Sequence, residues 1–319
     1  MGKKSKRGSG PRPGSNRAER VAARKARQAA ALAAPARPLA GLAAECDLVA
    51  MRAFIAAATA QVRFADGVDA PNEVDFATIL PGAVPAMVRE RDAATWGERG
   101  AAKGVDGTVR QGLAALQTDP EPADLAGELA AAISWAASAE PGAEYDGEPA
   151  ERALTELLDP EQQLDVVVYQ DFSWWFEGGQ IPAELAPMID RANDTIMPTA
   201  RLTPTSGVGA PWWVDAGERA HLRWVRPEDE DALMKAMARL HAAGRLTMGE
   251  GSRFAGSFRT HGLLVPVFDL DNEKHHEEWY AGLDQLDAWL TEALADESDL
   301  DAAERNSRAG IIGRQVTLR

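Results

Sequence analysis

One stretch constrains the fold of this chain more than any other, because strand and helix patterns follow each other closely over residues 220–270. Residues 221–226, HLRWVR, alternate apolar and polar side chains as a half-buried strand does. Pro227 and three acids then begin a helix pattern with an apolar stripe, which ends at Gly244. The apolar run 263–268 predicts an inner strand. This order of elements predicts an α+β core in which mixed sheets pack against helices.

The segment between these patterns, GEGSRFAGSFRTHG, is compatible with two structures. Its glycines suit a hairpin, but a short helix accounts for more of its residues. Ser252 then caps the helix, Phe254 and Phe258 share a face, and Gly262 ends it. We therefore predict a helix here. In the strand that follows, Pro266 cannot donate to a ladder and indicates a bulge or an edge position.

The remaining periodicity predicts further elements on both sides of a polar, proline- and glycine-containing break. The predicted helices cover residues 41–58, 120–140 and 277–298, and the predicted strands cover 60–64, 74–80 and 164–172. The predicted regions are a disordered basic tail (1–37), an N-terminal α+β half (38–138), a linker or surface loop (139–151), a C-terminal α+β half (152–298) and a C-terminal tail (299–319).

Composition limits the compartment and the fold size. A chain of 319 residues with 45% hydrophobic content is long enough for one large or two ordinary domains. Its one cysteine, Cys46, excludes an intrachain disulfide. We find no apolar run of about twenty residues and no secretory signal, and Lys6 stands where myristoylation needs Ser or Thr. We expect a soluble, cytoplasmic protein without a membrane partner.

Charge is divided unevenly along the chain. Residues 1–37 contain eleven Lys or Arg against Glu19 alone, a balance of +10, and the remaining 23 basic and 48 acidic residues leave −25. The first part of the tail is too polar to order itself, and the alanine-rich part after Asn16 favours a helix. The candidate residues for nucleic-acid contact are Lys3, Lys4, Lys6, Arg7, Arg12, Arg17, Arg20, Arg24, Lys25 and Arg27.

Two segments carry a resemblance to a known family. RPLAGLAAECDLVAMRAFIAAATA and the stretch 221–270 resemble an actinobacterial family of unknown function, over roughly residues 38–270. The resemblance implies a lysine- and arginine-rich leader joined to an acidic α+β body. Relatives in that family are sometimes labelled preprotein translocase subunits or topoisomerases.

The residues give these labels no support. A P-loop motor needs GxxxxGK[ST] to surround phosphates, and this string is absent. One cysteine is too few for the zinc tail of such translocases. None of Tyr145, Tyr169 and Tyr280 lies in a recognisable topoisomerase setting. The sequence also lacks GxSxG, HExxH and a GxGxxG after a strand, so the common hydrolase, metalloprotease and dinucleotide signatures are missing.

A glycine loop is the first candidate binding site. Gly249, Gly251, Ser252 and Arg253 form a flexible loop that runs into the predicted helix start, with Arg259 further along. Backbone amides beside a guanidinium suit phosphate or carboxylate. Ordinary helix capping, with both arginines paired to acids, explains the same residues and is favoured.

A cluster of acids and histidines is the second candidate. Asp269, Asp271, His275 and His276 follow the predicted inner strand, and their carboxylates and imidazoles suit a hard or borderline cation. Their spacing matches no known metal loop. A capping box at Asp271 or Asn272 fits better, so we predict no metal and no cofactor.

Adjacent tryptophans form a third feature. In an extended chain the rings of Trp174 and Trp175, and those of Trp212 and Trp213, point to opposite faces of a sheet. Burial under helices is the expected outcome, and exposure would indicate an interaction anchor.

Two classes of function follow from these patterns. The leading hypothesis is a binding or adaptor protein whose basic tail contacts RNA, DNA or the ribosome and whose acidic body holds a protein partner. The alternative is an enzyme that acts on an anionic small molecule at residues 249–253. A third, plainer interpretation is that the tail lies on its own acidic body.

Overall fold

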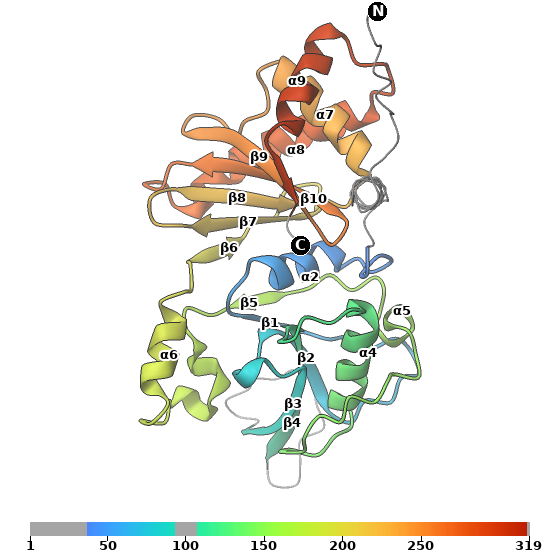
Figure 1. Cartoon of the computed structure of the whole chain (residues 1–319), viewed down its shortest axis with the longest axis vertical. Helices are drawn as coiled ribbons and strands as arrows, with labels where there is room; N and C mark the ends of the chain where they lie inside the picture. The colour runs from blue at the N-terminus through green and yellow to red at the C-terminus, as the bar shows by residue number, and fades with distance from the viewer. Residues whose placement is uncertain (1–36, 93–106, 318–319) are drawn as a thin grey trace, which may run out of the picture. The chain divides into compact units, whose positions relative to one another are not determined.

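The structure is a computed structural model that describes residues 37–92 and 107–317 (Figure 1). By contacts, the chain divides into Met1–Ala36 and one compact unit, Arg37–Arg319. The helices of the described part are α2 (Glu45–Ala53), α4 (Leu125–Ala136), α5 (Leu154–Leu157), α6 (Ala186–Asn193), α7 (Glu230–Ala242), α8 (Tyr280–Ala295) and α9 (Ala302–Ile312). Short 3₁₀ turns are η1 (Pro81–Ala83), η2 (Phe172–Trp175), η3 (Glu177–Gly179) and η4 (His276–Trp279).

The first sheet is mixed and has the strand order β3-β4-β2-β1-β5. Its strands are β1 (Ala58–Gln61), β2 (Glu73–Ile79), β3 (Ala86–Asp92), β4 (Thr108–Gln117) and β5 (Val166–Val168). Strands β2 and β4 pair in parallel, and the other neighbours are antiparallel. The predicted buried strand at 164–172 is shorter and lies at the edge, where Val167 is 37% exposed.

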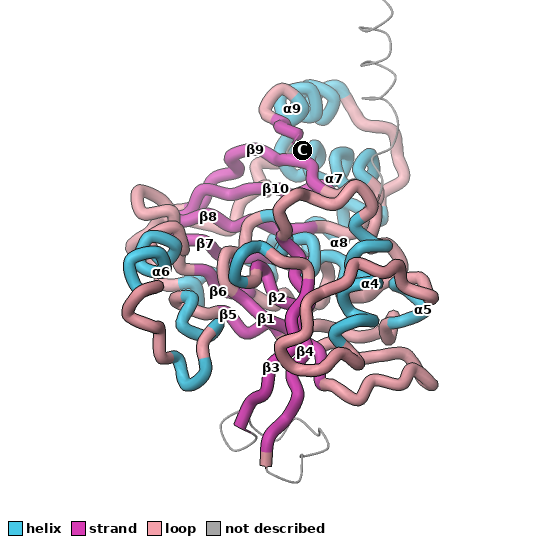
Figure 2. The backbone as a smooth tube through the Cα atoms, turned by 60° about the horizontal axis from the view of Figure 1, so that its bottom comes forward, coloured by secondary structure: helices cyan, strands magenta, loops and turns pink. Residues whose placement is uncertain are grey.

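The second sheet has the order β11-β9-β10-β8-β7-β6 (Figure 2). Its strands are β6 (Thr199–Arg201), β7 (Ala210–Asp215), β8 (Ala220–Val225), β9 (Ser252–Thr260), β10 (Leu263–Leu270) and β11 (Gln315–Thr317). Strands β6 to β10 are antiparallel, and β11 joins β9 in parallel. The predicted α+β fold with mixed sheets and helices is therefore confirmed for the described residues.

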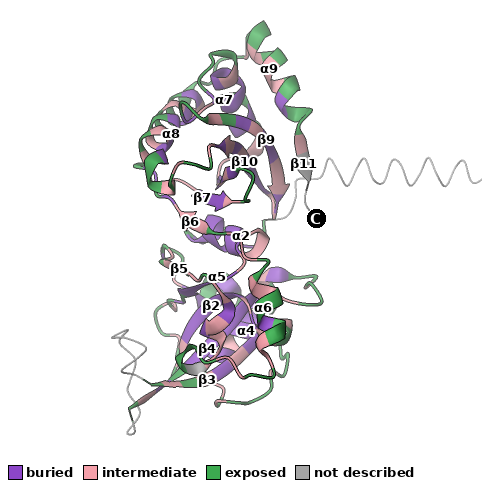
Figure 3. Ribbon diagram, turned by 90° about the vertical axis from the view of Figure 1, so that its left-hand side faces the viewer, coloured by how far each residue is buried: buried purple, intermediate pink, exposed green. Residues whose placement is uncertain are grey.

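Helix α2 contacts both sheets (Figures 1 and 3). Its Leu48 and Met51 are fully buried, in one apolar cluster with Phe76 of the first sheet and Trp212 of the second. Helix α4 covers the same side of the first sheet through Leu129. One core therefore joins the two sheets.

The outer faces of both sheets are covered by other elements. Helices α7 and α8 pack on the second sheet with Trp213, Leu233 and Leu283. Segment η2 and helix α6 cover the first sheet with Trp174 and Ile189. Trp212 and Trp213 thus face opposite sides of β7, as predicted, and both are buried.

Residues 249–262 contain strand β9, so the predicted helix is wrong. Strand β9 pairs with β10 through a two-residue turn at His261 and Gly262, whose φ values of 47° and 77° are typical of a tight hairpin. The register shifts by one residue between Val267 and Phe268, beside Pro266. The extra residue is Ala255 of β9, whereas Pro266 stays in register opposite Ser257. A bulge therefore lies in this ladder, but on the partner strand rather than at Pro266.

The shift also separates two phenylalanines that we placed on one face. Phe254 packs in the cluster under α7 and α8, whereas Phe258 packs against the cluster around α2. An extra residue in a strand reverses the side to which later residues point. The four-residue spacing of these rings therefore does not indicate a helix, because both rings lie in a bulged strand.

Two regions with no predicted regular structure differ from each other. Residues 139–151 form no helix or strand, whereas the predicted C-terminal tail contains α9 and β11. Helix α9 packs against α7 and buries Ile311. No helix among residues 37–92 and 107–317 is long and apolar enough to cross a bilayer.

Candidate functional site

The predicted nucleic-acid residues between Lys3 and Arg27 lie outside the described residues. Arg37, which we placed at the end of the tail, lies in the compact unit and pairs with the buried Glu45, Nε to Oε1 at 3.0 Å. The body therefore begins one residue earlier than the charge pattern indicated.

The glycine loop is a turn that enters a strand rather than a helix. Gly249 and Gly251 have φ values of 98° and 84°. Ser252 does not cap a helix; its hydroxyl accepts from the backbone N–H of Met248 at 2.7 Å. Lys274 donates to the backbone oxygen of Glu250 at 2.9 Å. The turn is held by its own hydrogen bonds.

The two predicted sites meet across the β9–β10 ladder. Arg253 lies opposite Asp269, and its guanidinium donates to that carboxylate at 2.7 Å. Arg259 pairs with Glu230 at the start of α7, Nε to Oε2 at 2.7 Å. Each guanidinium proposed for an anion is thus paired with a carboxylate of the body.

The acids and histidines proposed for a cation are dispersed over separate interactions. Burial acts to raise the pKa of Asp269, but hydrogen bonds from Arg253 and Arg219 and the neighbouring His221 hold that pKa below its usual value. Asp271 accepts from the backbone N–H of Glu273 at 3.0 Å. Across the described part of the chain, no three His, Cys, Asp or Glu side chains converge as metal ligands.

The turn before α8 starts later than the capping box we predicted at Asp271 or Asn272. The backbone N–H of His275 donates to Glu278 at 2.8 Å, so His275 precedes η4. The ring of His276 lies 4.0 Å from that of His275, and burial lowers the pKa of His276. These histidines help to shape the start of α8.

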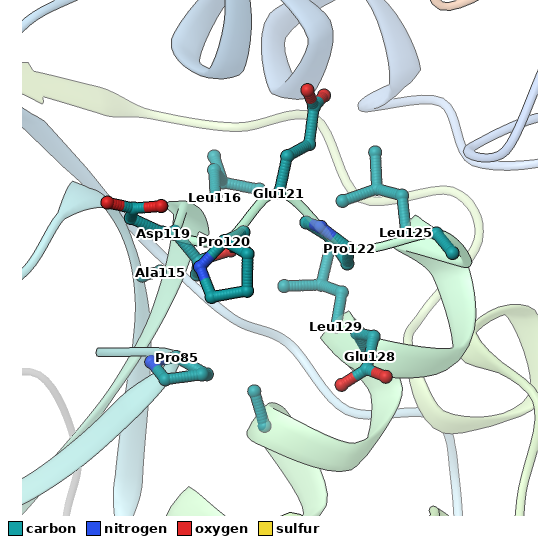
Figure 4. A pocket seen from close by; sticks show the side chains of 13 residues that line it. Pro85, Ala115, Leu116, Asp119, Pro120, Glu121, Pro122, Leu125, Glu128 and Leu129 are labelled. Carbon is teal, nitrogen blue, oxygen red and sulfur yellow. The ribbon is translucent and has the colours of Figure 1, made fainter. Parts of the chain in front are cut away.

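The described residues also contain a cleft that none of these predictions included. It lies between the end of β4 and helix α4, under the loop TDPEPAD, and has a volume of about 410 Å³ (Figure 4). Its wall consists of Pro85, Ala115, Leu116, Thr118, Asp119, Pro120, Glu121, Pro122, Ala123, Leu125, Glu128, Leu129 and Ala132. A volume in this range is typical of binding pockets.

The cleft has an apolar floor and a polar rim of acceptors. Leu116 and Leu129 are buried at its base. Three prolines supply no N–H, and Asp119, Glu121 and Glu128 supply carboxylates. The only side-chain donor in the wall is the hydroxyl of Thr118, which donates to the oxygen of Pro120 at 3.1 Å.

A buried arginine contacts the acidic rim of the cleft through Glu121. Arg52 of α2 donates to the backbone oxygen of Leu116, to Glu121 at 2.8 Å and to Nε2 of His261 at 2.8 Å. Its side chain is 7% exposed, and that of Glu121 is 66% exposed. Figure 4 shows the Glu121 side chain extending away from the floor of the cleft, which agrees with this ion pair.

His261 is held as a neutral acceptor at the tip of the β9–β10 hairpin. Because Arg52 donates to its Nε2, the proton lies on Nδ1, which is 2.8 Å from the hydroxyl of Thr260. Burial and the charge of Arg52 lower the pKa of His261, while Glu121 opposes this shift. Arg52 therefore connects the hairpin of the second sheet with Glu121 on the rim of the cleft.

A pair of arginines on β3 forms another polar cluster. Arg89 donates to Gln111 at 2.9 Å and to the backbone oxygen of Trp175 at 2.8 Å. Arg91 donates to the backbone oxygen of Trp174 at 2.9 Å. Burial and the neighbouring Arg91 lower the pKa of Arg89 to about 9. Because these donors bind backbone oxygens, the cluster fastens the aromatic turn to the sheet.

A family model described as a family of unknown function (DUF5926) matches residues 38–319. The chain belongs to this family. No curated protein and no solved structure matches the chain. The family match extends past the residues that carried the resemblance and includes α9 and β11.

The cleft had a weak signal in the sequence. The loop 118–124 combines three acids with two prolines, which indicates a surface turn but not a cavity. The floor comes from β4 and α4, and Pro85 directly precedes β3. Only the packing of these elements brings the acids and the apolar floor together.

Proposed function

We propose that this DUF5926 protein is an adaptor whose basic N-terminal tail contacts RNA or DNA and whose acidic body binds a protein partner. The supporting observation is the division of charge. With Arg37 assigned to the body, residues 1–36 contain ten Lys or Arg and one Glu, a balance of +9. The other 24 basic and 48 acidic residues give the body −24.

The geometry of the body supports this assignment of roles. Its arginines on β9 are paired with Asp269 and Glu230, so their charge is already balanced. A body with this excess of carboxylates repels phosphate, and polyanion binding therefore depends on the tail. The cleft beside α4 offers a protein partner an apolar surface with an acidic edge.

Removal of residues 1–36 tests the first half of the proposal. We expect the full chain to bind a labelled RNA or DNA duplex at low salt, with a logarithmic salt slope no steeper than about −9 for DNA. The truncated chain should lose this binding and keep its melting temperature. Fluorescence anisotropy across a salt series measures both.

A matched control replaces the tail's Lys and Arg by Gln in the full chain. This variant keeps the length of the tail and removes its charge, so it should behave as the truncation does. Failure of the full-length protein to bind either nucleic acid at low ionic strength would rule out the polyanion role.

The translocase and topoisomerase labels are not part of this proposal. The sequence has no P-loop lysine string. Tyr145 packs edge-on against Trp135 at 5.5 Å between ring centroids, and Tyr169 stacks on Trp174 at 5.0 Å. These two phenols serve packing.

A further inference from the structure

We infer that the cleft beside α4 binds a cationic peptide segment of a partner protein, one that carries Lys or Arg next to a bulky apolar residue. This inference deepens the proposed function, because it names the place on the body and the chemistry of the partner. It depends on the donor and acceptor pattern of the wall, on its apolar floor and on its unpaired acids.

The wall favours a ligand that donates hydrogen bonds. Its polar side chains are three carboxylates and the hydroxyl of Thr118, which already donates within the loop, and its three prolines have no N–H. The backbone N–H of Asp119 donates to Ala83 and that of Ala115 donates to Pro85. An anionic ligand finds acceptors where it needs donors, whereas an ammonium or guanidinium group is matched.

Two of the three carboxylates are available for such a ligand. Glu121 is paired with Arg52. Within the described residues, Asp119 and Glu128 take part in no ion pair, and both are exposed. Figure 4 shows Glu128 across the cleft from Pro85 and Asp119 at the other end of the loop. A segment lying in the cleft meets one negative charge near each end.

The floor adds a requirement for apolar bulk. Leu116, Leu125 and Leu129 line a volume of about 410 Å³, and burying an apolar side chain there removes it from water. Spermidine supplies donors without such an anchor. An amphipathic basic peptide supplies both, with the anchor in the cleft and its cations at the edge.

The chain's own tail is a poorer match than a partner protein. Residues 1–36 contain only Met1, Val21 and Leu32 as bulky apolar residues and no aromatic residue. The tail supplies positive charge, but Val21, next to Arg20, is its only bulky apolar residue with an adjacent basic residue, and valine is small for the floor of the cleft. We therefore assign the cleft to a second protein.

The test measures peptide binding to the full chain by fluorescence anisotropy at physiological salt. The probe is a short fluorescein-labelled peptide of Lys, Arg, Leu and Phe. One comparison peptide has Glu in place of every Lys and Arg, and another has Ser in place of every Leu and Phe. We expect binding of the first peptide only, and equal binding of the probe and either comparison peptide would overturn the inference.

Two variants locate the binding. The double variant Asp119→Asn with Glu128→Gln removes the two unpaired charges. It should lower the affinity for the probe peptide about tenfold. Ala123→Trp, at an exposed wall position, should block the cleft and abolish binding. The matched control Glu218→Gln with Glu292→Gln removes two exposed charges elsewhere and should change affinity by less than about twofold. Equal loss in the control and the cleft variant would overturn the assignment.

Two competitors distinguish other occupants. Displacement of the probe by a synthetic peptide of residues 1–36 at comparable concentration would assign the cleft to the tail and overturn the inference. Displacement by spermidine at comparable concentration would assign it to a polyamine, with the same consequence. The peptide titration is repeated with the unit 37–319, which lacks the tail on which nucleic-acid binding depends. Binding of the probe to this unit therefore tests the cleft independently of the nucleic-acid proposal.

Discussion

The two sheets of this protein use their charged residues differently. Around the second sheet, arginines and carboxylates lie within hydrogen-bonding distance of each other, as Arg253 and Asp269 do. Around the first sheet, Asp119 in the loop after β4 and Glu128 in α4 form no ion pair in the described part of the chain, and both lie beside an apolar cleft. An excess of acid is therefore not a site in itself. In the cleft, packing leaves carboxylates unpaired beside buried apolar side chains.

The largest expected effect tests how strongly the second sheet depends on its internal pairing. Arg226 is 1% exposed, and its Nη1 lies 3.6 Å from the buried Asp287. Asp287→Ala leaves a buried guanidinium with Glu228 as its remaining partner, and we expect the free energy of unfolding to fall by about 3 kcal/mol. Chemical denaturation measures this change.

The matched control for that variant is an exposed pair in the same region. Arg253 is 72% exposed in its pair with Asp269, so Arg253→Ala should cost no more than about 1 kcal/mol. Similar losses in both variants would show that burial does not separate the structural pairs from the surface pairs.

The next largest effect is expected for glycines that lie directly against neighbouring backbone, one in each region. A Cβ at Gly112 of β4 would lie 2.4 Å from the backbone oxygen of Ala136, and one at Gly282 of α8 would lie 2.1 Å from that of Met248. Gly112→Ala and Gly282→Ala should each destabilise by about 1–3 kcal/mol, because backbone has to move. Thermal unfolding should then show one transition for each variant, since α2 joins the sheets in a single core.

A glycine without close neighbours provides the control for helix propensity. Gly310 of α9 has nothing within 4 Å of a built Cβ. Gly310→Ala should therefore raise the free energy of unfolding by up to about 1 kcal/mol. Two separate transitions in the Gly112→Ala variant would contradict the single core.

The smallest effect concerns the contact between the two regions at His261. Its pKa is lowered in the folded protein, so the unfolded chain binds more protons as pH falls below the usual histidine range. The contribution of His261 to the free energy of unfolding is fully present above its unfolded pKa of about 6.5. This contribution is lost as pH falls through the lowered pKa of the folded protein. Urea unfolding between neutral pH and pH 5 should show this loss.

His261→Asn sharpens that measurement. Asparagine tolerates the positive φ of this turn, and it does not titrate. The variant should be less sensitive to acid than the natural protein over the same interval. An unchanged pH profile would assign the acid sensitivity to other groups, such as His276, whose pKa is also lowered.

Local sequence patterns determined most elements but not their partners. The stripe through Leu233 and Leu240 predicted α7, because apolar side chains that recur at three- and four-residue spacing over several turns give a helix one buried face. The same spacing of Phe254 and Phe258 gave a wrong helix, because the bulge in β9 depends on pairing with β10. A long stripe carries enough information for a helix, and two rings do not.

The sequence by itself determined the charge division, the α+β class and the acidic, proline-containing loop before α4. Only the tertiary structure decided which acids are used internally. Ion pairs such as that between Arg253 and Asp269 join residues 16 positions apart, and the pair between Arg52 and Glu121 joins residues 69 apart. Ion pairing depends on distance in space, which composition does not encode. The cleft likewise exists only because β4, α4 and Pro85, which precedes β3, meet around it.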